Sequence, residues 1–156
     1  MYDKLFVPTD GSRASDLALD HALSLAKIHD AAVHVVYVVD TTVYYRHPGV
    51  ADTVIAELEA DGERLMQDLR DRFDDEPVSI QTEIGYGIPH EEIQEYASEN
   101  NVDLIVMGTH GKTPLKRAVM GSVTEWLVTN CDRPVLTVKD VEKEGTLESE
   151  RKETTE

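Results

Sequence analysis

The feature that most constrains the fold is a regular alternation of short apolar segments with longer segments of helical periodicity. The apolar segments are rich in Val, Ile and Leu and have the length of buried strands; they span residues 4–8, 32–39, 78–84, 103–107 and 134–138. Helical periodicity between them predicts helices over residues 13–29, 51–73, 89–99 and 123–130. Strands that alternate with helices form parallel sheets, so the sequence predicts an α/β, doubly wound, five-stranded parallel sheet with helices on both faces.

The segments outside these elements divide the chain into one domain and a tail. Residues 40–50 are predicted to be a loop, and Ser122 is predicted to cap the last helix. Residues 1–139 have the length of one domain and carry all the predicted strands. From residue 140 the chain is charged and polar without periodicity, so residues 140–156 are predicted to form an acidic, disordered tail.

The charge balance argues against some partners. The chain has 31 Asp and Glu against 15 Lys and Arg, which gives a formal net charge of −16. A field of this sign repels nucleic acids and anionic membrane surfaces, so neither is expected as a partner. Such acidity also fits a salt-rich cytoplasm, where ions screen the repulsion, and a halophilic source is one hypothesis beside an ordinary acidic protein.

The chain is expected to be soluble and cytoplasmic. The N-terminal sequence MYDKLFVPTDG lacks the apolar core of a signal peptide, and the longest apolar run, residues 35–39, is far shorter than a membrane span. The single cysteine, Cys131, excludes a disulfide within the chain, which suits a reducing compartment.

The carboxyl ends of the strands are where a ligand is expected. Doubly wound sheets bind ligands beyond these ends, at the point where the strand order reverses. This rule selects residues 8–10, residues 38–40 and the segment that begins at Met107. The last segment is unusual because residues 104–124 contain no Asp or Glu in an acidic chain, yet they contain lysines and an arginine.

Two structures that attract anions flank this basic segment. Gly108 and Gly111 allow the backbone to turn and to approach a ligand closely, and exposed N–H groups in such a turn bind anions. Gly121 and Ser122 open a helix whose free N–H groups and dipole favour an anion, while the hydroxyls of Ser122 and Thr124 add donors. A polyphosphate suits this arrangement. The alternative is a glycine-rich connection with a helix cap and a solvated basic face, and the residues alone leave both open.

Other ligand motifs fail at single positions. A P-loop that ends at Lys112 requires glycine at position 106, which is Val106, and a dinucleotide fingerprint that begins at Gly85 requires glycine at position 90, which is His90. The histidines show no zinc spacing, and no Ser, Cys or carboxylate lies beside His110 in the sequence. No catalytic or metal-binding residue is therefore predicted.

Two aspartates at strand ends are interpreted differently. For Asp10 the residues alone leave two interpretations open: a side chain that contacts a ribose or supports a metal, and a turn or N-cap aspartate. Asp40 is assigned to the loop that follows its strand.

The sequence resembles the universal stress protein family, in particular its ATP-binding branch. The motif G-2x-G-9x-G-[ST] of that branch is complete in Gly108, Gly111, Gly121 and Ser122. The stretches KLFVPTDGS, YVVD and GIPHEEI are also similar, and the resemblance covers residues 2–139 in order.

This resemblance implies an adenine nucleotide alpha-hydrolase-like fold with strand order 3-2-1-4-5 and a homodimer formed through the last strand. It also implies ATP as ligand, with Mg²⁺ or Mn²⁺ held mainly by phosphate oxygens and water. The site residues that it implies are, at the adenosine end, Pro8, Thr9, Asp10 and Val38; near the ribose, Met107 and Gly108; around the phosphates, Thr109, His110, Gly111, Lys112 and Thr113; and, at the helix start, Gly121, Ser122, Val123 and Thr124.

Three functions are compatible with these observations. The first is an ATP-binding stress-response or regulatory module with at most slow ATPase activity, because no positioned base or Walker B acid is recognisable. The second is a dimeric, chaperone-like stress protein on the same fold that binds no nucleotide. The third, an adenylating enzyme, is disfavoured because residues 8–13 read PTDGSR instead of the S-G-G-x-D-S loop of that class.

Overall fold

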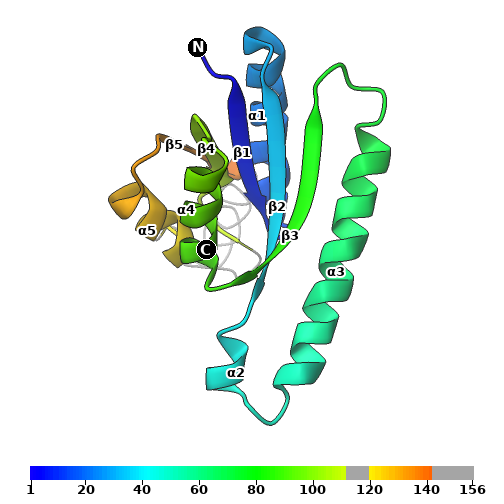
Figure 1. Cartoon of the computed structure of the whole chain (residues 1–156), viewed down its shortest axis with the longest axis vertical. Coiled ribbons are helices and arrows are strands. Elements are labelled where there is room, and N and C mark those ends of the chain that lie inside the picture. Colours follow the sequence, from blue (N-terminus) through cyan, green and yellow to red (C-terminus); the bar gives the residue numbers. More distant parts are fainter. Residues whose placement is uncertain (112–119, 142–156) are drawn as a thin grey trace, which may run out of the picture.

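The sheet of this protein has the predicted topology. The structure, a computed structural model, describes residues 1–111 and 120–141. Five parallel strands form a sheet in the order β3-β2-β1-β4-β5 (Figure 1), which confirms the predicted fold class and strand order. The strands are β1 (Lys4–Thr9), β2 (Ala32–Asp40), β3 (Ile80–Gly87), β4 (Leu104–Gly108) and β5 (Val135–Val138).

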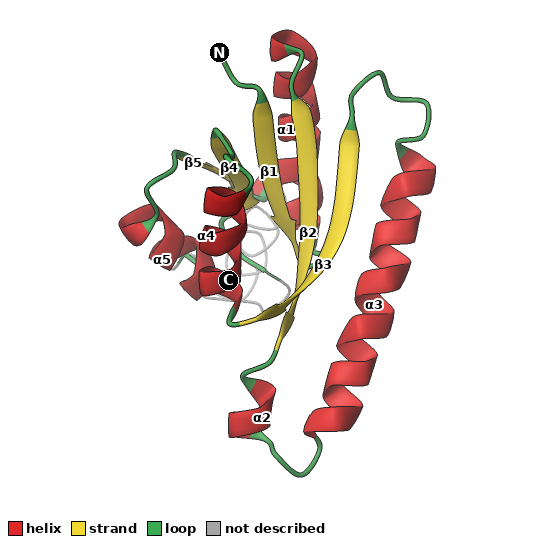
Figure 2. Cartoon of the chain, in the orientation of Figure 1, coloured by secondary structure: helices red, strands yellow, loops and turns green. Residues whose placement is uncertain are grey.

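Helices cover both faces of the sheet (Figure 2). On one face lie α1 (Arg13–His29) and α3 (Ala51–Arg72), and on the other lie α4 (Pro89–Glu99) and α5 (Ser122–Asn130). The short helix α2 (Val43–Arg46) lies in the connection from β2 to α3, at the end of the molecule where β2 finishes. None of the helices in the described ranges is long and apolar enough to cross a bilayer.

Alternate residues of each strand pack into two separate hydrophobic cores, because successive side chains of a strand point to opposite faces. In β1, Leu5 and Val7 pack with α1 and α3, whereas Phe6 packs with α4 and α5. In β2 the same alternation places Tyr37 in the first core and Val36 in the second. Strands buried on both faces explain why the sequence shows continuous apolar runs.

Three predicted details differ from the structure. Residues 40–50 are not a plain loop, because the Asp40 carboxylate accepts a hydrogen bond from the Thr42 amide at 2.9 Å and starts the turn that leads into α2. The predicted strand over residues 78–84 ends too early, because residues 85–87 extend β3 by pairing with the end of β2. Ser122 is the first residue of α5 and not its cap, since the extended residue before the helix is Gly121 and no side chain caps it.

The strand ends leave one side of the sheet open where the order reverses. β1 pairs with β2 as far as Thr9, but with β4 only as far as Phe6. β2 continues to Asp40, and its last residues pair with β3 alone. One edge of β2 and the ends of β1 and β4 therefore face a common space, which is where the functional site is expected.

Candidate functional site

A cavity of about 590 Å³ opens at the carboxyl ends of β1, β2 and β4. Its volume lies within the range that accommodates small-molecule ligands. The sequence-predicted residues that line it are Pro8, Thr9, Asp10, Val38, Met107, Gly108, His110, Gly111, Gly121, Ser122, Val123 and Thr124. The fold thus brings together segments that are more than a hundred residues apart in the sequence.

The remaining predicted residues are placed differently. Thr109 does not line the cavity: it is buried, its hydroxyl lies 3.1 Å from His110 Nδ1, and its amide donates to the Val138 carbonyl at 3.0 Å. Lys112 and Thr113 lie outside the described residues.

Two hydrogen bonds hold the start of α5 against the end of β4. The Gly121 amide donates to the Thr109 carbonyl at 2.7 Å, and the Thr124 hydroxyl donates to the Gly108 carbonyl at 2.9 Å. The Gly121 amide and the Thr124 hydroxyl proton are therefore engaged within the protein. The first backbone bond of the helix runs from the Glu125 amide to the Gly121 carbonyl, so the amides in the first turn of α5 have no intrahelical acceptor.

Each glycine of the motif meets a different neighbour. A Cβ at Gly108 would lie 2.7 Å from Ala14 Cβ and 3.0 Å from the Ala14 carbonyl carbon, so α1 packs directly on this backbone. A Cβ at Gly111 would lie 2.5 Å from Asp10 Oδ2. Gly108 is therefore required by the packing of α1, whereas Gly111 allows the loop after β4 to lie against the Asp10 carboxylate.

The β1–α1 turn positions Asp10 at the cavity. Asp10 Oδ1 accepts a hydrogen bond from the Ser12 amide at 2.9 Å, and Gly11 supplies the positive φ of 78° that the turn needs. Ser12 then caps α1, since its hydroxyl accepts from the Ser15 amide at 3.2 Å. Asp10 is thus a turn-forming residue whose carboxylate also faces the site.

The cavity has an apolar side and a polar side. Facing α4 and α5, its wall is formed by Val36, Val38, Ile93, Met107 and Val123. Facing α1 and α3, it is formed by Ser12, Ser15, Tyr37, Leu58 and Asp61. Burial raises the pKa of the Tyr37 hydroxyl above its usual value of 10.0, and the carboxylates of Asp61 and Asp10 add to this effect.

Several lining residues were not among the site residues predicted from the sequence. They are Ser12, Ser15, Val36, Tyr37, Asp40, Leu58, Asp61, Pro89 and Ile93. Asp40, which the sequence assigned to a loop, accepts from the Thr42 hydroxyl at 2.6 Å and from Arg46 at 3.1 Å. Its position at the end of β2 was a usable signal. No sequence signal marked Leu58 and Asp61, because helical periodicity identifies the buried face of α3 but not which of its turns passes the cavity.

The described residues contain no cluster of three His, Cys, Asp or Glu side chains arranged to hold a metal ion. The histidine of the site, His110, contacts the Thr109 hydroxyl through its Nδ1 atom.

Comparison with known proteins identifies the family. Residues 1–139 match the universal stress protein family. Universal stress protein MJ0531 of Methanocaldococcus jannaschii is 40% identical over 146 residues, which cover 92% of this chain and 86% of that protein. The solved structure of MJ0577 from the same organism superposes with a TM-score of 0.78 at 33% identity, covering 89% of this chain and 96% of that one.

A further solved structure carries a ligand. It is a universal stress protein in complex with cAMP, with a TM-score of 0.64 and 25% identity, and it covers 88% of this chain and 97% of that one. The sequence match, the extent of the relatives and the shared adenine nucleotide alpha-hydrolase-like fold lead to one conclusion: this chain belongs to the universal stress protein family.

Proposed function

We propose that this protein binds ATP in the cavity at the strand ends and acts as a nucleotide-binding regulatory module of a stress response. The observation that carries the proposal is the hydrogen bond from the Gly121 amide to the Thr109 carbonyl. It holds the glycine-rich end of β4 beside the N-terminus of α5, so two anion-attracting backbone segments border one cavity.

The nucleotide is proposed to lie across the strand ends. The open edge of β2 at Val38, with Pro8, Thr9 and Asp10, takes the adenosine, because free strand amides and carbonyls match the hydrogen-bonding edge of a base. Support for an adenine nucleotide comes from the relative solved with cAMP. Met107 and Gly108 lie near the ribose in this arrangement.

The triphosphate is proposed to run from the end of β4 to the start of α5. The residues proposed to contact it are His110, Gly111, Lys112, Thr113, Gly121, Ser122, Val123 and Thr124, whereas Thr109, also predicted there, is buried behind them. Within this set, the Ser122 hydroxyl and the amides of the first turn of α5 are the donors that fit phosphate oxygens, since the Thr124 hydroxyl proton and the Gly121 amide have internal acceptors.

Mg²⁺ or Mn²⁺ is proposed to accompany the nucleotide. Phosphate oxygens and water supply most of the coordination, and the Asp10 carboxylate beside Gly111 fits an outer position around the ion. The ion neutralises phosphate charge. Hydrolysis is expected to be slow at most, because backbone amides and hydroxyls bind and position phosphates without activating water.

The protein is also proposed to be a cytoplasmic homodimer that associates through β5. This strand lies at the edge of the sheet, and its Leu136 side chain is 37% exposed. An edge strand with an exposed apolar side chain is a surface suited to pairing with a second copy.

A binding experiment with a glycine variant tests the site. Isothermal titration calorimetry with Mg-ATP is expected to give binding below about millimolar for the wild type, and Gly121→Val is expected to weaken it by more than about tenfold. A Cβ at Gly121 would lie 3.2 Å from the Thr109 carbonyl oxygen, so a branched side chain pushes the two backbone segments apart.

The control is Gly49→Val, because a Cβ at Gly49 has no atom within 4 Å. It should bind as the wild type does. A wild type that fails to bind ATP at millimolar concentrations refutes the function, and an unchanged affinity in Gly121→Val refutes the site.

A further inference from the structure

Tyr37 is an enclosed side chain in the wall of the cavity. It lies in β2 on the face covered by α1 and α3, and it is only 5% exposed. Its ring packs against Gly62 in the middle of α3, where a Cβ would lie 2.6 Å from Tyr37 Cδ1. A glycine weakens a helix interior, so its presence here is explained by the space that the ring needs. The ring position is therefore determined by close packing.

The Tyr37 hydroxyl differs from other buried tyrosine hydroxyls. It has no hydrogen-bond partner among the residues that the structure describes, although buried hydroxyls normally have one. The hydroxyl oxygen is nevertheless accessible. Among the residues that the structure describes, the side-chain atom that is both fully buried and without a hydrogen-bond partner is Arg133 Nε, and not the Tyr37 oxygen. Tyr37 is otherwise enclosed and lines the cavity, so we take the cavity to be the open space that this hydroxyl reaches.

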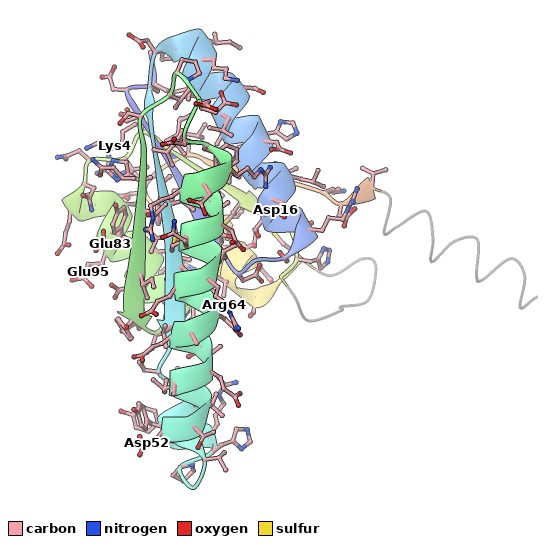
Figure 3. The ribbon with its side chains drawn as sticks, turned by 90° about the vertical axis from the view of Figure 1, so that its right-hand side faces the viewer. Lys4, Asp16, Asp52, Arg64, Glu83 and Glu95 are labelled. Atoms are coloured by element: carbon pink, nitrogen blue, oxygen red, sulfur yellow. The ribbon has the colours of Figure 1, made fainter. Side chains whose placement is uncertain are left out.

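Asp61 places an acceptor near this donor. It precedes Gly62 in α3, lines the same cavity, and keeps its carboxylate half-exposed while accepting from Arg64, which Figure 3 shows midway along the helix. Burial keeps the pKa of Tyr37 above its usual value and the negative charge of Asp61 adds to this effect, so the hydroxyl remains protonated and can donate. The polar side of the cavity thus offers one hydrogen-bond donor and one acceptor.

We propose that Tyr37 and Asp61 select adenine, with the Tyr37 hydroxyl donating to N7 and the Asp61 carboxylate accepting from the 6-amino group. This assignment rests on the proposed function and leaves the N1 side of the base to the open edge of β2. Adenine presents an amino donor beside the N7 acceptor, whereas guanine presents the O6 acceptor beside N7. A carboxylate opposite O6 leaves two acceptors facing each other, so guanine is rejected.

The first test pairs a side-chain deletion with an atom deletion in the ligand. The wild type is expected to bind ATP about three- to tenfold more tightly than 7-deaza-ATP, which lacks N7. Tyr37→Phe keeps the ring against Gly62 but removes the hydroxyl. It should bind ATP about three- to tenfold more weakly than the wild type and bind both nucleotides equally.

The second test concerns the carboxylate. Asp61→Asn is expected to reduce the preference for ATP over GTP by at least about fivefold, because an amide can donate to O6. The matched controls are Tyr45→Phe, whose side chain is 89% exposed, and Asp68→Asn, which is exposed on the same helix as Asp61. Both should keep the wild-type affinities.

The outcomes separate this inference from the proposed function. If the wild type binds ATP and 7-deaza-ATP equally, or if Tyr37→Phe keeps full affinity for ATP, the recognition of N7 is overturned while ATP binding stands. If Asp61→Asn discriminates against GTP as strongly as the wild type, the role of the carboxylate is overturned. If the wild type binds no adenine nucleotide, both the function and this inference fail.

Discussion

At the scale of residues, the glycines of the motif are needed for two different reasons: close packing of a neighbouring helix and the backbone conformation at a helix start. The spacing of the motif alone does not tell them apart. Gly108 is needed because α1 passes against it, with the Ala14 carbonyl carbon 3.0 Å from the position of a Cβ. Gly121 begins the helix in an extended conformation and donates its amide to Thr109. Part of a motif associated with phosphate binding therefore serves to pack the site together.

Gly108→Ala is expected to lower the free energy of unfolding by ~1–3 kcal/mol, because the new methyl group meets backbone atoms of α1 that cannot move aside. Urea unfolding measures the change. The control is Gly49→Ala, which adds its methyl group in open space and should alter stability by less than ~0.5 kcal/mol. If the two variants prove equally stable, packing is not the reason for Gly108.

The sequence was sufficient to place the glycines but not to assign the hydroxyls. Glycines at a strand end indicate a turn and a close approach of the backbone, and this can be inferred from the neighbouring residues alone. Gly108, Gly111 and Gly121 were therefore predicted at the cavity, and they line it. The partner of the Thr124 hydroxyl is the Gly108 carbonyl, 16 residues away. Such a contact depends on how α5 meets β4, and no pattern within α5 contains that information.

At the scale of elements, the long periodic segments were predictable and the short ones were not. The α1 and α3 helices begin at the predicted residues, because their apolar stripes extend over many turns. The four-residue α2 is too short to show a period, and it depends on the Asp40 side chain for its first turn. The end of β3 contains two glycines and resembles a turn, yet pairing with β2 makes it a strand.

The contact between β2 and α4 introduces a pH dependence. His34 is 4% exposed and lies with its Nδ1 atom 2.7 Å from the Tyr96 hydroxyl. Burial lowers the pKa of His34 below 6.5, Lys4 lowers it further, and Glu83 opposes this shift. Burial together with the Glu83 carboxylate raises the pKa of Tyr96 to about 12, so the tyrosine stays neutral throughout.

The sign of the effect follows from proton uptake. Since the pKa of His34 is lower in the folded protein, the unfolded chain binds more protons as the pH falls below 6.5, and stability is lost until the folded histidine also protonates. Between about pH 7.5 and about pH 5, His34→Gln should show a shallower loss of stability than the wild type, by up to ~1.4 kcal/mol per pH unit.

Chemical denaturation at a series of pH values measures these slopes. His47→Gln is the control because His47 is exposed in the α2–α3 connection, and its slope should equal that of the wild type. Comparing slopes removes any constant loss of stability that His34→Gln causes. Parallel wild-type and His34→Gln curves would show that the buried histidine does not govern acid stability.

At the scale of the whole molecule, an acidic exterior surrounds the cavity that we propose binds a polyphosphate. The carboxylates are distributed over the surface and along α3 (Figure 3), and the net charge is −16. A polyphosphate approaching such a molecule is repelled at long range and attracted only near the backbone amides. Salt that screens the surface should therefore favour both folding and nucleotide access.

Salt dependence is the test of this charge distribution. The thermal midpoint of unfolding is expected to rise between about 0.1 M and about 2 M KCl, because the screening length falls from ~10 Å to less than ~3 Å and self-repulsion disappears. A variant with Glu57, Glu63 and Asp68 replaced by Gln, Gln and Asn removes exposed charges from α3 and should show a smaller rise. A wild type with the same midpoint at both concentrations contradicts the halophilic hypothesis. If the thermal midpoint of the variant rises as much as that of the wild type, the salt effect comes from ion binding or hydration and not from repulsion along α3.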